Sequence, residues 1–599
     1  MSSTLLLRHE VPLADTWDLS PLFPTDQAWE ESFQKLAELY PSLSDFRGNL
    51  KKSAQELLNL FEFQKKLNQS IEQLCQYASL RLSEDSSSAP SLEREGRFQS
   101  LMTKIEEASS FIAPEIQAID DKTFACFLAD PLLKEWTIPL ERLRRQRSHT
   151  LSDREERLMA LCGSTIEGHS ETFSQLTNVD MTFGTVRDDQ GRDITLTQSS
   201  FSSLLQRPDR NVRKEAFEKF YQEFSDHRYT LASSLASSIK GDVFHARARH
   251  YPSALEEALF DDDVPLSVYD NLITAVRSRR DILFRYYELR RRIFDLPDLH
   301  VYDTYAPLVA SVQSNVSFEE ATDKILASLH PLGKEYVQTL SRGLTQERWC
   351  DRYENKGKRS GAFSAGGYQG PPYILMNYKA DVFSDIYTLT HEAGHSMHTW
   401  YARQTQTFQN YHYPIFLAEV ASTFNEVLLT EHLLQTSDDP KMRAYIINRQ
   451  IDDLRGTLFR QTMFAEFEKI THAAEEAGEA LTLDFFRKTY RTLLDTYFGP
   501  NVVIDEALEL ECLRIPHFYN AFYVYQYATG ISAAVTLATE VLEKGNHECY
   551  LDFLRSGGSR FPIETLKAAG VDMKTPAPVD TTLALFERRV KELEELLRK

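Results

Sequence analysis

Residues 386–400 of the 599-residue chain read IYTLTHEAGHSMHTW, and this stretch predicts both a helix and its chemistry. His391 and His395 are four residues apart, so on a helix both imidazoles lie on one face and can reach a single ion. Glu392 follows His391 directly, where its carboxylate can reach a water at that ion without binding the metal. The expected buried side of the helix consists of Ile386, Leu389, Ala393, Met397 and Trp400.

Two histidines leave a catalytic zinc site one protein ligand short, because such sites use three protein ligands and keep one position open for water. Cysteine is excluded as the third ligand, since the nearest one, Cys350, lies far upstream. His398 is seven residues from His391, roughly 10 Å along a helix axis, so we expect it to be structural or substrate-facing. The metzincin pattern is also excluded, because it needs glycine and histidine where this chain has His398 and Tyr401.

A second predicted helix, at 415–426, carries two acids that could complete the site. Glu419 and Glu426 are seven residues apart and therefore share a face of that helix. The loop at 403–414 can turn this helix back against the first, and Gly394 allows another segment to approach closely. From the spacing alone either glutamate could bind the metal, and the other could then orient one of the imidazoles.

The composition indicates a large globular protein without a nucleic-acid partner. Hydrophobic residues make up 42% and charged residues 26% of the chain, and the net charge is -21. Nucleic-acid binders normally show a basic face, so the acidic balance argues against that class. The arginines at 277–280 and 290–292 are expected to form solvated helix faces.

The location expected for this chain is the cytoplasm, with no membrane partner. Its six cysteines are scattered without a CxxC pair, which is typical of a reducing compartment. The first apolar run is three residues long, too short for a signal peptide, and no stretch approaches the roughly 18 apolar residues of a membrane span.

Helical periodicity dominates the chain, but two places predict β structure. A hairpin is expected at 183–197, around the polar turn at 188–191. Two short extended runs, at 361–364 and 373–376, flank a loop rich in glycine and proline just before the histidine motif. The chain ends in an expected amphipathic helix with a buried stripe of Leu583, Phe586, Val590, Leu593 and Leu597.

Several motifs together resemble the M3 family of oligopeptidases, and most closely its oligoendopeptidase F branch. They are GAF at 361–363, PYILMNY at 372–378, HEAGH at 391–395 and AEVASTFNE at 418–426. Further matches are RQ at 460–461, FAEFE at 464–468, YFG at 497–499, IPHFY at 515–519 and YATG at 527–530. The resemblance covers about 198–585, and the helical region before it is similar to that branch's own.

The resemblance implies a predominantly all-α fold: a large two-lobed multi-helix peptidase body with a deep central channel and a small β-sheet beside the active site. It places a zinc peptidase catalytic domain at 198–599. The two regions expected before it are an N-terminal helical region at 1–110 and a helical region ending in the β-hairpin at 111–197.

The resemblance also implies Glu419 as the third ligand, beside His391 and His395, for one Zn²⁺ per chain. It further implies that His517, Tyr523 and Tyr527 approach the substrate from the opposite wall, where a phenol can donate to a developing oxyanion.

The expected activity is hydrolysis of internal bonds in short peptides, with Glu392 as general base. A carboxypeptidase or dipeptidyl carboxypeptidase on the same scaffold is the first alternative. A catalytically silent peptide-binding protein is the second, and the intact Glu392 argues against it because a binding module needs no general base.

Overall fold

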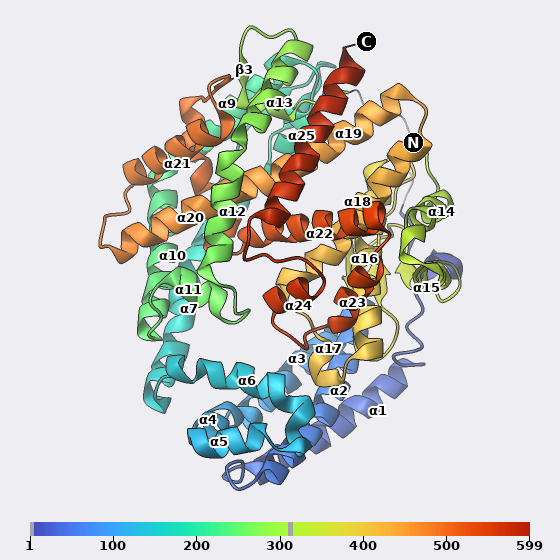
Figure 1. The fold of residues 1–599 in the computed structure, drawn as a ribbon, viewed down its shortest axis with the longest axis vertical. Coiled ribbons are helices and arrows are strands. Elements are labelled where there is room, and N and C mark those ends of the chain that lie inside the picture. Colours follow the sequence, from blue (N-terminus) through green and yellow to red (C-terminus); the bar gives the residue numbers. More distant parts are fainter. Residues whose placement is uncertain (1–4, 310–314, 599) are drawn as a thin grey trace. The chain divides into compact units, whose positions relative to one another are not determined.

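The computed structural model describes residues 5–309 and 315–598 and is built almost entirely of helices (Figure 1). This confirms the predominantly all-α fold with a few small sheets. The chain forms two compact units, each made of three separate segments. Unit 1 comprises Met1–Arg147, Gln313–Leu433 and Leu537–Val571, and unit 2 comprises Ser148–Val312, Leu434–Thr536 and Asp572–Lys599. The predicted lobes, channel and domain boundaries stay predictions.

The first segment of unit 1 is a set of helices around an apolar core. Thr25 and Ser53 begin two of them as N-caps, because each hydroxyl accepts a hydrogen bond from a backbone N–H in the first turn. Helix α2 supplies several of the buried residues, among them Leu57 and Leu60. The helices are α1 (Asp26–Leu39), α2 (Ala54–Glu84), α3 (Ala89–Ser109), α4 (Ile112–Gln117), α5 (Asp121–Leu128) and α6 (Thr137–Arg145).

The rest of unit 1 holds a three-stranded sheet and the two helices of the histidine and glutamate motifs. Strand β6 (Tyr373–Leu375) lies in the middle, parallel to β4 (Cys350–Asp351) and antiparallel to β5 (Phe363–Ala365). This pairing confirms the two extended runs expected before the motif. The helices are α14 (Phe318–Ser328), α15 (Lys334–Thr345), α16 (Ser384–Thr405), α17 (Phe408–Tyr411), α18 (Ile415–Thr436), α23 (Glu548–Ser556) and α24 (Pro562–Ala568).

Unit 2 contains the predicted hairpin and most of the remaining helices. Strands β1 (Thr185–Arg187) and β2 (Asp193–Thr195) pair antiparallel, as expected. Strands β3 (Leu299–His300) and β7 (Val502–Val503) pair parallel. The helices of this unit are α7 (Asp153–Gln175), α8 (Gln198–Leu205), α9 (Arg210–Asp226), α10 (Arg228–Ala248), α11 (Ala254–Phe260), α12 (Leu266–Ser278), α13 (Arg280–Ile293), α19 (Pro440–Leu454), α20 (Gln461–Glu476), α21 (Leu483–Phe498) and α25 (Ala577–Leu597), with the start of α22 (Tyr525–Lys544).

The terminal helix α25 confirms four members of the expected stripe, because Leu583, Phe586, Val590 and Leu593 are buried, whereas Leu597 near its end is only partly buried. The solvated face expected at 290–292 is wrong for Arg290, which is fully buried. Its guanidinium donates to the Tyr286 hydroxyl at 2.8 Å and to the backbone oxygen of Ala306. These partners replace water for the charge, so the side chain joins α13 to the segment that follows β3.

Among the described helices none has both the length and the apolar character needed to cross a membrane. The predicted cytoplasmic location stays a prediction.

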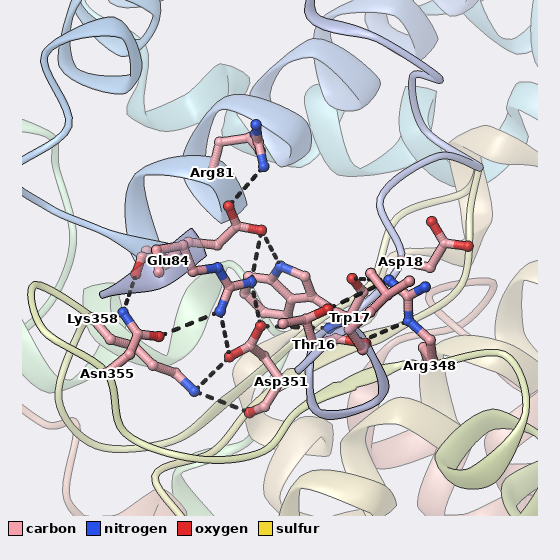
Figure 2. Close-up of polar contacts among 12 residues, drawn as sticks. Thr16, Trp17, Asp18, Arg81, Glu84, Arg348, Asp351, Asn355 and Lys358 are labelled. Atoms are coloured by element: carbon pink, nitrogen blue, oxygen red, sulfur yellow. Dashed lines mark hydrogen bonds and ion pairs between the residues drawn. The ribbon is translucent and has the colours of Figure 1, made fainter. Parts of the chain in front are cut away.

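A buried network of charged side chains ties the N-terminal segment to the sheet in unit 1 (Figure 2). At its centre, the Asp351 carboxylate accepts from Arg8 at 2.5 Å and from the Lys358 ammonium at 2.6 Å. Lys358 is inaccessible to solvent and also donates to the backbone oxygens of Tyr353 and Met376. One buried lysine therefore joins the ends of β4 and β6, and Asp351 compensates its charge.

The network predicts a large loss of stability in Asp351→Ala. The substitution leaves the buried Lys358 ammonium without its carboxylate, while Arg8 keeps Glu84, and the uncompensated lysine costs about 3–5 kcal/mol. Chemical denaturation followed by circular dichroism measures the change. The control is Glu62→Gln, which removes an exposed ion pair to Lys65 and should change stability by less than about 0.5 kcal/mol. Equal stability of the two variants would contradict the role given to Asp351.

Candidate active site

Helix α16 brings the two motif histidines together on one face. Its opposite side is anchored in the core, because Ile386, Leu389 and Met397 are almost completely buried. The Nε2 atoms of His391 and His395 lie 3.2 Å apart. The spacing of four residues therefore yields two nitrogen donors aimed at one point, as the sequence predicts.

Helix α18 reaches this point because α16 carries a glycine where the two helices meet. A Cβ on Gly394 would lie 2.5 Å from the backbone oxygen of Ala421 and 2.7 Å from the Cα of Ser422. Such distances are far inside van der Waals contact, so only glycine permits this approach of the two backbones. The close approach expected at Gly394 is present, and α18 supplies it.

Glu419 on α18 completes a group of three donors. Its Oε2 lies 3.3 Å from His391 Nε2 and 3.7 Å from His395 Nε2. Around an ion with bonds of about 2.0–2.1 Å, tetrahedral donors lie about 3.3 Å apart. The nitrogen and oxygen donors and their spacing therefore fit a zinc-like ion with one position left for a further ligand.

Glu426 is directed at the other side of His391. Its Oε1 lies 2.6 Å from His391 Nδ1, so a proton on Nδ1 is held by the carboxylate and Nε2 is left to face Glu419. The spacing in sequence left both glutamates open as ligands, and in the structure they meet different nitrogens of the same ring. For His395, a hydrogen bond to the Ala418 backbone restricts the ring in a similar way.

The electrostatics of this group favour a positive charge among the donors. Burial alone would lower the pKa of His391, but hydrogen bonds to Glu419 and Glu426 outweigh it and raise that pKa to about 10. Burial and the neighbouring His391 lower the pKa of His395 to about 4. Burial would raise the pKa of Glu419, yet its hydrogen bond to His391 and both imidazole charges bring it to about 2. The carboxylates thus create a site where a cation is stabilised.

Glu392 lies next to the donor group without belonging to it. Its side chain is only 7% exposed, and burial raises its pKa to about 7. A backbone hydrogen bond from Ser364 in β5 opposes this rise. The Ser364 hydroxyl also lies 2.8 Å from that of Ser396 on α16, so the outer strand of the sheet is fastened beside Glu392.

His398 packs in the core and does not face the three donors. It is fully buried, and its ring stacks on Tyr413 with the centroids 3.6 Å apart. Burial holds the pKa of His398 well below 6.5, so the ring is neutral. Of the two roles expected for His398, the structure favours the structural one. No sequence pattern identifies Tyr413 as its partner, because that residue belongs to the short connection between α17 and α18.

The three residues expected at the opposite wall form a cluster of their own in unit 2. The Tyr527 hydroxyl lies 3.4 Å from His517 Nε2, and the rings of Tyr523 and Tyr527 are 5.3 Å apart. The His517 ring stacks parallel to that of Tyr523 at 6.1 Å. Burial lowers the pKa of His517, so the imidazole is neutral at pH 7 and can donate through one nitrogen. Their contact with substrate stays a prediction.

Comparison with known proteins decides the family. Residues 203–585 match the model described as Peptidase family M3, and residues 115–183 match the one described as Oligopeptidase F. The chain belongs to peptidase family M3. The resemblance carried by the sequence motifs is confirmed, and so is the prediction of a metallopeptidase.

Relatives named as oligopeptidases or oligoendopeptidases match nearly the whole chain. Oligopeptidase PepF of Bacillus subtilis is 42% identical over 595 residues, which cover 99% of this chain and 88% of that protein. An Oligoendopeptidase F homolog of Borreliella burgdorferi is 39% identical and covers 99% of this chain and 100% of its own.

Two solved structures are similar over the full fold. The crystal structure of oligoendopeptidase-F from Enterococcus faecium has a TM-score of 0.73 and 34% identity, covering 96% of this chain and 99% of that one. A crystal structure from Chlamydophila abortus has a TM-score of 0.93 and 35% identity, covering 99% of this chain and 100% of that one. The helical architecture is therefore shared with members of the family.

The contact at Gly394 predicts that Gly394→Ala weakens metal binding. The added Cβ forces α18 away from α16 and displaces Glu419 from the imidazoles. Competition with a chromogenic chelator should show zinc affinity lowered by about 10–100-fold, the range found when the support of a metal ligand is altered. The control is Gly96→Ala in α3, where a Cβ meets open space and zinc affinity should stay unchanged. Wild-type zinc affinity in Gly394→Ala would contradict the proposed dependence on this contact.

Proposed function

We propose that this M3 peptidase is a zinc-dependent endopeptidase that hydrolyses internal bonds of short oligopeptides. The observation that carries the proposal is the convergence of His391, His395 and Glu419 with a buried carboxyl, Glu392, beside them. A binding protein has no use for a buried acid beside its metal site, whereas a hydrolase uses one as general base. The names of the relatives, oligopeptidase and oligoendopeptidase F, support short peptides as substrates.

The proposed roles of the chain's own groups follow from their positions. His391, His395 and Glu419 hold the metal, and Glu426 keeps His391 in the tautomer that presents Nε2. When bound, zinc supplies Lewis-acid polarisation of the peptide carbonyl and lowers the pKa of a water toward about 7. Glu392 takes the proton of the attacking water and later gives it to the leaving amine. Burial makes the Glu392 carboxylate a stronger base than an exposed glutamate, as proton transfer from water requires.

Two further groups of residues are proposed to contact the substrate. His517, Tyr523 and Tyr527 present N–H and O–H donors, which stabilise negative charge on the carbonyl oxygen in the transition state. Strand β5 is proposed to bind the peptide backbone as an added strand. Within the described sheet it pairs with β6 on one side only, and its residues are partly exposed. Backbone pairing tolerates different side chains, as expected for a peptidase of mixed oligopeptides.

The mechanism predicts that Glu392→Gln binds zinc but loses turnover. The amide cannot accept the proton of water, so kcat should fall by at least about 10²–10⁴-fold while zinc stoichiometry stays at one per chain. A quenched-fluorescence peptide assay and metal analysis measure the two properties.

The matched variant is His391→Ala, which should lose zinc together with activity because one of three ligands is gone. Wild-type turnover in Glu392→Gln would exclude this residue as the base. Full zinc occupancy in His391→Ala would remove that histidine from the ligand set.

The endopeptidase assignment predicts cleavage of peptides with both ends blocked. N-acetylated, C-amidated peptides should be cut at internal bonds at rates similar to those of their free counterparts, because backbone pairing along β5 needs no terminal charge. Mass spectrometry of the products locates the bonds. A carboxypeptidase or dipeptidyl carboxypeptidase would leave the amidated peptides intact and trim the free ones, and that result would overturn the endopeptidase proposal.

A further inference from the structure

A strained residue stands directly before Tyr523 in unit 2. Phe522 has a φ of 59°, in the left-handed region that a bulky side chain rarely adopts. The segment from η11 (Pro516–Tyr519) to the start of α22 carries His517, Tyr523 and Tyr527. A backbone conformation of this kind persists only where its surroundings enforce it. The contacts of Phe522 therefore show what holds this turn.

The backbone of Phe522 is held by a carboxyl on another helix. Its N–H donates to Glu468 Oε1 of α20 at 2.8 Å, and both residues are only 2% exposed. The other carboxyl oxygen of Glu468 has no hydrogen-bond partner among the described residues. The Glu468 carboxyl thus bonds to one backbone N–H in a buried position, where such a hydrogen bond is strong and its loss costly.

The side chain of Phe522 is fixed by the same helix. His472, one turn after Glu468, lies against the Phe522 ring with the centroids 4.5 Å apart. The His472 ring is itself held from both sides: Nδ1 is 2.8 Å from the Glu468 backbone oxygen and Nε2 is 3.2 Å from Asp242 Oδ2. Tyr269 meets the Phe522 ring edge-on at 6.1 Å. Rotation about the Phe522 backbone is therefore opposed at both its N–H and its ring.

This fixed residue sets the direction of the tyrosines. Immediately after it, the backbone bonds from Gln526 N to Tyr523 O and from Tyr527 N to Val524 O form the first turn leading into α22. Tyr523 and Tyr527 are four residues apart and face the same way, with ring centroids at 5.3 Å. A change of φ at Phe522 would turn both phenols together away from His517.

We infer that Glu468 is a positioning residue that locks Phe522 in the left-handed conformation and so holds Tyr523 and Tyr527 beside His517. The inference rests on the proposed role of these tyrosines as donors to the transition state. A buried acid outside the candidate metal site would thereby control the arrangement of these donors.

The lock needs only an acceptor oxygen from Glu468. Burial, with the nearby charge of Asp242, raises the pKa of Glu468 well above 4.5, which favours the uncharged form of the carboxyl. An amide of the same shape offers the same acceptor. Glu468→Gln should therefore preserve the lock, whereas Glu468→Met, of similar length, removes the acceptor without adding bulk.

The test uses the full-length chain, with zinc supplied for activity. Glu468→Met should lower kcat by about 10–100-fold with KM and zinc content unchanged, because misplaced donors act in the transition state rather than in substrate binding. Glu468→Gln should stay close to wild type. Tyr527→Phe provides the reference, and the double variant with Glu468→Met should lose little more than either single variant. If Glu468→Met does not fold, Glu468→Asp, which withdraws the carboxyl by one methylene, replaces it.

Hydrogen–deuterium exchange of the segment 516–527 in the metal-free protein tests the lock without activity. Exchange should speed up in Glu468→Met and not in Glu468→Gln, because only the former frees the Phe522 N–H. Unchanged exchange in Glu468→Met overturns the lock. If Glu468→Met exchanges faster but keeps a wild-type kcat, while Tyr527→Phe has a lowered kcat, the link between the lock and catalysis is overturned. A wild-type kcat in both Tyr527→Phe and Tyr523→Phe would instead refute the proposed role of the tyrosines, and with it the catalytic role given to Glu468.

Discussion

The contact between α16 and α18 at Gly394 is the constraint on which the candidate active site depends. A metal site of three protein donors tolerates errors of only a few tenths of an ångström, and its donors come from two helices. The histidines are placed by one helix alone, through their spacing. Glu419 is placed by the distance between two backbones, and that distance is set by a missing side chain. The geometry of the site is therefore a property of helix packing as much as of the motif.

The same site illustrates how one arrangement assigns different roles to similar groups. Glu392, Glu419 and Glu426 are three glutamates within reach of one imidazole pair, yet burial raises the pKa of the first and hydrogen bonding lowers that of the second. Glu426 faces the nitrogen of His391 that points away from the donor group. The proposed roles of base, ligand and orienting group thus follow from local differences in solvation and direction rather than from residue type.

Much of the fold and of the candidate site could be predicted from the sequence. The rest depends on contacts between residues that are far apart in the chain. The helix of the motif, the hairpin at 183–197 and the strand pair before the motif follow from local periodicity. Spacing could not choose between Glu419 and Glu426, because both lie on one face and only the approach of α16 separates them. The burial of Arg290 depends on the path of the chain at Ala306. The φ of Phe522 has no local signal, since glycine and asparagine are the usual residues in that conformation.

The discontinuous make-up of unit 1 has a consequence for how the protein is synthesised. The segment of unit 1 that carries His391, His395 and Glu419 ends at residue 433, but the same unit also needs 537–571, where α23 packs on α16 and Phe553 lies beside His398. Translation produces these residues only after the segment up to 433, so a nascent chain that has reached 433 leaves the histidine helix without part of its core. Both helices of the candidate site therefore exist before their packing partner does, and their final arrangement waits for the later segment.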